Sequence, residues 1–217
     1  RTIDVWTEEA LRGALGVSGT VTLRADIETA DELKFLCDAA LDLNGHTLTV
    51  AGGTKAIKSS GGKTLTVQGN GTVYGALYAD KEGFKFGSTL IVNAGENFSV
   101  QSSSESGWAV YGALNSKIVL NGGTYSVGDI ESNTGVVEFL GQSLEINDAT
   151  VNVTAETVLD AYGIHSNAAE TYLNDATVNA KYSRAVYLNN SLGKTVIRGG
   201  SFTTDKYTTN FVINPTI

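Results

Sequence analysis

The chain has 217 residues and a formal net charge of −8, with 25 Gly, one Pro and one Cys. This acidic balance argues against nucleic acid and anionic membrane surfaces as partners, because both require a basic patch. The abundance of Gly, Asn, Ser and Thr favours many short strands joined by turns over a helical bundle. No apolar run approaches the ~20 residues of a membrane span, and the lone Cys37 excludes an internal disulfide.

The first predicted element is a short helix in TEEALRGALG, residues 7–16. Thr7 is a favourable N-cap, two Glu residues follow in the first turn, and Leu11 and Leu15 fall on one face. An amphipathic helix needs an apolar surface to cover. We therefore expect this helix, together with Trp6, to cap the N-terminal end of the fold.

The segment LDLNGHTLTV, residues 41–50, begins a repeat that fills the rest of the chain. It returns as LTVQGNGTVY, LIVNAGENFSV, IVLNGGTYSV, LEINDATVNV, TYLNDATVNA and TVIRGGSFTT. Its turn residues recur every 24 to 28 residues, at Asn44, Gln68, Asn93, Asn121, Asn147, Asn174 and Arg198. Seven copies with this period predict an all-β parallel β-helix solenoid of about seven rungs.

Period-two alternation predicts which side chains of each rung face the interior. Ahead of most copies lies a separate first strand, as in KAIKSS, ALYAD and WAVYGA. It would contribute one stacked column: Ile57, Leu77, Val110, Val137, Ile164 and Val186. The strand after each turn would contribute a second: Leu48, Val73, Phe98, Tyr125, Val151, Val178 and Phe202. Residues of one column would touch, because consecutive rungs lie ~4.8 Å apart.

The turn residues predict a ladder of side-chain hydrogen bonds. Asn tolerates the left-handed backbone of a sharp turn, and its amide can bond to the Asn of the next rung. We therefore interpret Asn44 and its equivalents as structural. Asp148 and Asp175 each follow one of these Asn residues, and we interpret both as turn residues rather than calcium ligands. No metal and no cofactor is expected.

The outward side chains of the first strand of each rung form what we call the first-strand column. Its members are Lys58, Tyr78, Tyr111, Glu138, His165 and Tyr187, with Trp108 at the strand edge. Tyr and Trp offer large contact areas to sugars or protein partners. The candidate ligand-binding residues are Tyr78, Trp108, Tyr111, His165 and Tyr187. An aromatic ladder that only stabilises the sheet is the open alternative.

One insertion, ADKEGFKFGS at residues 79–88, carries Phe84 and Phe86. Exposed rings on a loop would make a docking tip. We expect instead a lid that folds over the outward apolar residues Ile91 and Val119.

The N-terminal helix, GTVTLRADI at residues 19–27 and LDLNGHTLTV together resemble the start of right-handed parallel β-helix proteins of the pectate-lyase-like superfamily. The wording is most similar to surface proteins of Gram-positive gut bacteria. The resemblance covers the chain as architecture and implies a right-handed coil. Function stays open, because the superfamily includes lyases, hydrolases, adhesins and phage tailspikes.

This resemblance implies two kinds of catalysis to test. Polygalacturonase-like members pair Asp residues with a His. The matching residues here are Glu138 and His165, which provide one carboxylate where hydrolysis normally uses two. Pectate lyases combine a calcium site with a proton-abstracting Arg, for which Arg184 beside Asp160 is the candidate. No acidic cluster of that kind is visible, so these four residues are weak candidates and no catalytic site is expected.

We expect a single domain over residues 1–217, with a cap helix in 1–18 and coils in 19–217. A start without Met indicates a piece of a longer chain. The expected function is non-catalytic binding or adhesion by a secreted or cell-wall-attached bacterial protein. The expected partner is a host glycoprotein (mucin or immunoglobulin) or a polysaccharide. The alternatives are a polysaccharide lyase or glycoside hydrolase, and a structural stalk.

Overall fold

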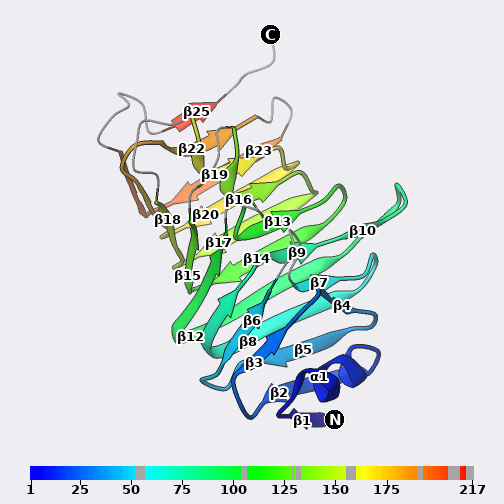
Figure 1. Ribbon diagram of the computed structural model, residues 1–217. Coiled ribbons are helices and arrows are strands. Elements are labelled where there is room, and N and C mark those ends of the chain that lie inside the picture. The colour runs from blue at the N-terminus through cyan, green and yellow to red at the C-terminus, as the bar shows by residue number, and fades with distance from the viewer. Residues whose placement is uncertain are drawn as a thin grey trace.

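Each repeat folds into one coil of a parallel β-helix, as predicted (Figure 1). The computed structural model describes residues 1–51, 57–103, 107–128, 130, 133–154, 160–189, 193–204 and, for the backbone alone, 211–213. Within these ranges the chain is almost entirely strands and turns, with one short helix near the N-terminus. The all-β solenoid fold class is thereby confirmed.

The coils build three faces, and the first strands of the rungs, which come one strand ahead of the Asn turn, form a separate eight-stranded sheet. This sheet contains β4 (Leu33–Phe35), β7 (Ile57–Ser59), β9 (Leu77–Ala79), β13 (Val110–Gly112), β16 (Gly135–Phe139), β19 (Tyr162–Ser166), β22 (Arg184–Leu188) and β25 (Phe211–Ile213). All of its neighbouring strands pair in parallel.

The other two faces belong to one 15-stranded sheet that bends at a corner. The face before the corner contains β1 (Thr2–Val5), β2 (Gly19–Leu23), β5 (Ala39–Asp42), β8 (Thr64–Tyr74), β12 (Thr89–Ser102), β14 (Lys117–Asn121), β17 (Ser143–Asn147), β20 (Glu170–Asn174) and β23 (Lys194–Arg198). The face after it contains β3 (Ile27–Thr29), β6 (Thr47–Val50), β15 (Thr124–Val127), β18 (Thr150–Val153), β21 (Thr177–Ala180) and β24 (Ser201–Thr203). The long strands β8 and β12 run through the corner and pair on both sides of it.

An additional rung precedes the first sequence repeat. Residues 19–35 supply β2, β3 and β4, which pair with the first repeat at Val21–Leu41, at Ile27–Leu48 and at Leu33–Ile57. This rung lacks the Asn phrase, so the repeat alone could not reveal it.

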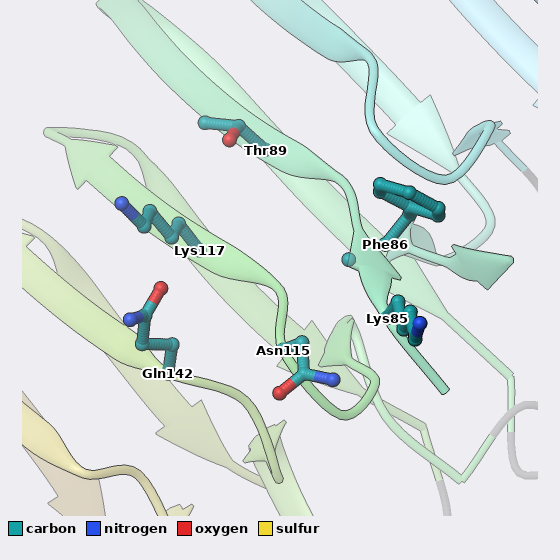
Figure 2. Close-up of a pocket in the computed structure, with 7 residues that line it drawn as sticks. Lys85, Phe86, Thr89, Asn115, Lys117 and Gln142 are labelled. Atoms are coloured by element: carbon teal, nitrogen blue, oxygen red, sulfur yellow. The ribbon is translucent and has the colours of Figure 1, made fainter. Parts of the chain in front are cut away.

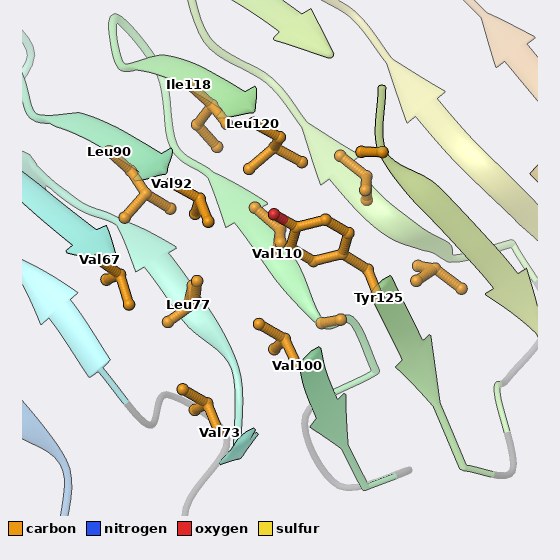
Figure 3. Packing of buried hydrophobic residues seen from close by; sticks show 14 of the residues in the cluster. Val67, Val73, Leu77, Leu90, Val92, Val100, Val110, Ile118, Leu120 and Tyr125 are labelled. Atoms are coloured by element: carbon orange, nitrogen blue, oxygen red, sulfur yellow. The ribbon is translucent and has the colours of Figure 1, made fainter. Parts of the chain in front are cut away.

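The two predicted interior columns run through the centre of the coil (Figure 3). The first is confirmed at every position, since Ile57, Leu77, Val110, Val137, Ile164 and Val186 pair in sequence and are fully buried.

The second column is wrong at one place. Val73 and Tyr125 both pair with Val100, not with Phe98. The chain between Ala94 and Phe98 forms a bulge that shifts the register. Phe98 remains buried, with its ring centre 6.4 Å from that of Tyr125. The shift follows from the longer turn of this rung, because extra residues move the strand along its neighbour.

The Asn ladder is present in the middle of the coil. Asn121 donates to Asn93 at 2.9 Å, Asn147 to Asn121 at 2.8 Å, and Asn174 to Asn147 at 2.7 Å. Arg198 continues it by donating to Asn174 at 3.3 Å. Asn121, Asn147 and Asn174 thus each donate to one rung and accept from the next, which is the structural role that the repeat predicts.

The first repeat does not join this ladder through Asn44. Gln68 pairs with Asp42, and Asn44 donates instead to the carbonyl of Leu23 at 3.0 Å. Asn44 is left-handed, with φ 49°, as expected. In later rungs the residue after the ladder Asn takes that conformation, as in Asp148 and Asp175 with φ 51° and 53°. The interpretation of both aspartates as turn residues fits this geometry.

Truncating an interior member of the ladder should cost more than truncating its end. Asn147→Ala removes a bond on each side, and we expect a loss of about 1–2 kcal/mol in the free energy of unfolding. Asn93→Ala removes only the bond accepted from Asn121, so about half that loss is expected. Urea unfolding of both variants measures the difference. Equal losses of stability in the two variants would show that the number of ladder hydrogen bonds that an Asn makes does not affect stability.

The helix α1 (Glu8–Ala14) lies across the N-terminal end of the coil. The Thr7 side chain accepts from the third amide after it at 3.2 Å, which confirms the N-cap. Leu11 and Ala14 are buried against the first coil. Trp6 is 58 % exposed, so the expectation that it shares in this cap is wrong. It precedes the helix and lies outside the apolar stripe that faces the coil.

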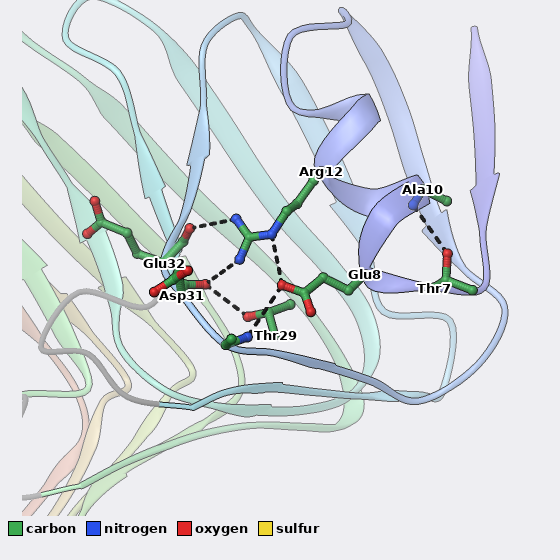
Figure 4. A network of polar contacts seen from close by, with 8 residues as sticks. Thr7, Glu8, Ala10, Arg12, Thr29, Asp31 and Glu32 are labelled. Carbon is green, nitrogen blue, oxygen red and sulfur yellow. Dashed lines mark hydrogen bonds and ion pairs between the residues drawn. The ribbon is translucent and has the colours of Figure 1, made fainter.

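Polar contacts tie the helix to the neighbouring coil (Figure 4). Arg12 Nε lies 2.8 Å from Glu8 Oε1 within the helix. The two terminal nitrogens of Arg12 donate to the carbonyls of Asp31 and Glu32 at 3.0 and 3.3 Å. The cap helix is therefore held in two ways. The Arg12 guanidinium donates to two carbonyls of the neighbouring turn, and the apolar side chains of the helix are buried against the coil.

Candidate functional site

The first-strand column is assembled as predicted. Lys58, Tyr78, Tyr111, Glu138, His165 and Tyr187 occupy successive paired positions on the eight-stranded sheet. The structure divides it into an aromatic cluster, a carboxylate–imidazole pair and a second aromatic cluster.

The first aromatic cluster joins Tyr78, Trp108 and Tyr111. The two tyrosine rings stack with centres 4.6 Å apart and planes 14° apart. The Trp108 ring centre lies 4.5 Å from that of Tyr111 and 6.5 Å from that of Tyr78. Tyr78 is only 7 % exposed, whereas Trp108 and Tyr111 are half-buried. A ligand would therefore contact Trp108 and Tyr111, with Tyr78 as support beneath them.

Glu138 and His165 form a close pair in the middle of the column. His165 Nδ1 lies 2.8 and 3.0 Å from the two carboxylate oxygens of Glu138. The backbone amide of Gly135 donates to the same carboxylate at 2.9 Å. Glu138 is 9 % exposed. An ionised carboxylate can only accept, so this geometry places a proton on His165 Nδ1.

The second aromatic cluster contains a residue that the sequence analysis missed. Tyr162 stacks on Tyr187 with ring centres 4.9 Å apart, and its centre lies 5.2 Å from that of His165. By alternation, Tyr162 would point inward like Ile164. In the structure Tyr162 lies instead beside the outward residues His165 and Tyr187. The residue that faces the interior is Gly163, where an added Cβ would come within 2.3 Å of Val178. Alternation therefore fails at the start of β19.

The four weak catalytic candidates gather around this second cluster. Arg184 Nε lies 3.5 Å from Asp160 Oδ1, and Arg184 pairs in register with Tyr162. The pKa of Tyr162 is raised, first by burial and then by the charge of Asp160, while Arg184 opposes the shift. The charge of Glu138 also contributes to the increase. The sequence candidates are thus neighbours in space, although Asp160 is half-exposed and Glu138 is not.

The phenols of the first cluster are held in their neutral form. Burial raises the pKa of Tyr78 well above its ordinary value, and the neighbouring Tyr111 and Asp80 raise it further. Burial also raises the pKa of Tyr111, followed by the charge of Glu138. Neutral rings with hydroxyl donors suit hydrogen bonding to a neutral or polar ligand.

Two buried ring nitrogens of this face have no hydrogen-bond partner among the residues that the structure describes. They are Trp108 Nε1 and His165 Nε2, one beside each aromatic cluster. Buried polar atoms are normally satisfied, and exceptions often mark sites where a ligand or water binds. A modest movement of the covering side chains would offer these atoms to a ligand.

The insertion at residues 79–88 is not a lid. It forms the hairpin β10 (Lys81–Glu82) and β11 (Phe86–Gly87), and Phe84 and Phe86 are 85 % and 60 % exposed. The lid expectation is therefore wrong. Beside the hairpin lies a hollow of about 410 Å³ (Figure 2). The residues that line it are Lys85, Phe86, Gly87, Thr89, Asn115, Lys117 and Gln142.

No protein-family model, curated protein or solved structure matches this chain. Over the described ranges, no group of three or more His, Cys, Asp or Glu residues is placed to hold a metal ion. The helix of the described part of the chain is too short to cross a membrane.

Proposed function

We propose that this chain is a non-catalytic binding module of a secreted or cell-wall-attached bacterial protein. In this proposal the first-strand face binds a host glycoprotein (mucin or immunoglobulin) or a polysaccharide, and the chain belongs among the pectate-lyase-like β-helices. The observation that carries it is the pair of aromatic clusters on one face, with a half-buried ring in each. Tyr111 and Tyr187 occupy one column of the sheet with two rungs between them, and Trp108 packs against Tyr111, which suits an extended ligand such as a glycan chain.

The Glu138–His165 pair favours binding over hydrolysis. Glu138 already accepts from His165 and from the Gly135 amide, and it is the column's only carboxylate. Glycoside hydrolysis normally uses two carboxyl groups, placed on either side of the scissile bond. A carboxylate that already accepts from these two donors is well suited to hold the imidazole in place between the aromatic clusters.

The test measures retention of polysaccharides, mucin and immunoglobulin on immobilised protein, together with newly formed sugar ends. The double variant Tyr111→Ala, Tyr187→Ala should weaken retention at least tenfold, because aromatic anchors carry much of the energy of such contacts. Tyr74→Ala is the matched control, since Tyr74 is 45 % exposed on another face. Retention that survives the double variant would move the site elsewhere.

A polysaccharide lyase or hydrolase is the second candidate. The convergence of Glu138, His165, Arg184 and Asp160 around Tyr162 favours it. New sugar ends that depend on Glu138 or Arg184 would establish it and overturn the binding proposal.

A structural stalk is the third candidate, favoured by the burial of Tyr78 and by rings that stack on one another between rungs. Absence of retention across the panel, with a stability loss in the double variant, would support the stalk.

A further inference from the structure

The hairpin β10–β11 is firmly held although its rings are exposed. A Cβ at Gly61 would lie 2.4 Å from the backbone nitrogen of Glu82, and a Cβ at Gly87 would lie 2.0 Å from the carbonyl carbon of Asn115. The side-chain amide of Asn115 donates to the carbonyl of Phe84 at 2.7 Å. Two turns of the coil therefore clamp the hairpin from both sides. The exposed rings are presented by a fixed backbone, which lowers the entropy lost when a ligand binds.

The hollow beside the hairpin has the volume of a small-ligand site and a mostly polar lining. Its volume of about 410 Å³ falls in the ~300–1,000 Å³ range of such sites. Thr89 and Lys117 are paired neighbours on β12 and β14, and Gln142 stands just before β17 on the next rung. Figure 2 shows these three side chains on neighbouring strands, with Phe86 and Lys85 of the hairpin to one side of them. The site is thus built from three rungs and the hairpin.

The charge of the hollow is opposite to that of the whole chain. Lys85 and Lys117 both line it, while the chain carries a net charge of −8. Among the ion pairs of the described residues, none includes either lysine. The two lysines give the hollow a locally positive charge in an acidic protein, which favours an anionic ligand.

We propose that this hollow binds a terminal glycan sugar that bears a single acidic group, either a carboxylate or a sulfate ester. Lys117 binds the anion, Lys85 adds to the local positive charge, the Phe86 ring stacks on the apolar face of the sugar, and the side-chain amides of Asn115 and Gln142 bond its hydroxyls. A polyanionic chain is disfavoured because the net charge of −8 of this chain repels it. This inference rests on the proposed glycan-binding function and adds a separate subsite to it.

The test uses isothermal titration of the full chain with sialyllactose, a sulfated lactosamine and neutral lactose. We expect at least one acidic sugar to bind about tenfold more tightly than lactose, with a preference that weakens as salt rises. Lys117→Gln should remove that preference, and Phe86→Ala should weaken every sugar. Lys34→Gln, an exposed lysine on β4, is the matched control and should change nothing.

Equal binding of acidic and neutral sugars would overturn the inference, as would a preference unchanged by Lys117→Gln. Polygalacturonate that binds more tightly than the single acidic sugars, through Lys117, would overturn it in favour of a polyanion site. The Tyr111→Ala, Tyr187→Ala variant separates the two proposals. If neutral glycans lose binding only in this variant and acidic sugars show no preference, the aromatic site is supported and the hollow is not a binding site. An acidic preference that depends on Lys117, without any effect of the tyrosines, would do the reverse.

Discussion

Tyr125→Ala is expected to lower the free energy of unfolding by about 3–5 kcal/mol, the range typical of a large aromatic truncated in a core. Tyr125 is fully buried in the second interior column, between Val100 and Val151. Its ring also packs against Phe98. The loss combines transfer of the ring to water with a cavity that the stacked rungs cannot close. Urea unfolding followed by circular dichroism measures it.

The conservative variant Tyr125→Phe separates packing from hydrogen bonding. The Tyr125 hydroxyl donates to the carbonyl of Gly122 at 3.1 Å. Its removal should cost only about 1 kcal/mol, because the ring still fills its place. A Phe variant as unstable as the Ala variant would assign the stability to the hydroxyl and contradict the packing argument. Burial also raises the pKa of Tyr125 far above its ordinary value, so both comparisons hold across the neutral pH range.

The interior of the coil could be predicted because the repeat and the alternation agree. Ile57 and Leu77 are 20 residues apart in the sequence, but each stands at the same place in its rung and they pair directly. When one side of a strand is buried, only one register keeps its apolar side chains inside. Once the inward residue of one rung is known, the inward residues of the other rungs follow. The first-strand column follows from the same logic on the outward side.

The mistakes lie where turn length changes. Their places in the repeat phrase assign Asn44 to the ladder and Phe98 to the second interior column. The structure aligns rungs by backbone pairing, which places Asp42 beside Gln68 and Val100 beside Val73. Insertions in turns are tolerated at small cost, so their length carries little information about register.

Two features of the sites had no clear sequence signal. Tyr162 faces outward because Gly163, next to it, occupies the interior, and only a tertiary contact with Val178 reveals that. The hollow joins Lys85, Lys117 and Gln142 from three different rungs, and none of them belongs to the repeat phrases. Phe84 is exposed on a hairpin that approaches the coil closely at Gly61 and Gly87, whereas the apolar residues Ile91 and Val119 favoured a lid over them.

Glu138→Ala is expected to destabilise the protein by about 3–5 kcal/mol, as is typical when one partner of a buried pair is removed. The change leaves His165 Nδ1 and the amide of Gly135 without their acceptor, both in a largely buried setting. Glu138→Gln is the matched variant. It keeps one acceptor oxygen of similar size, so about half of the loss should return.

The same pair of variants has a second measurable consequence at Tyr111. The charge of Glu138 raises the pKa of this phenol, after burial. A negative charge disfavours the phenolate, so its removal in Glu138→Gln should lower the pKa of Tyr111. The pKa should stay above the ordinary value, because burial is the larger cause and is unchanged. A titration followed by the NMR signal of the labelled Tyr111 ring measures this. An unchanged pKa would mean that the carboxylate is electrostatically isolated from the aromatic cluster. The pair would then act on the ligand only through the position of His165, not through the charge of the whole face.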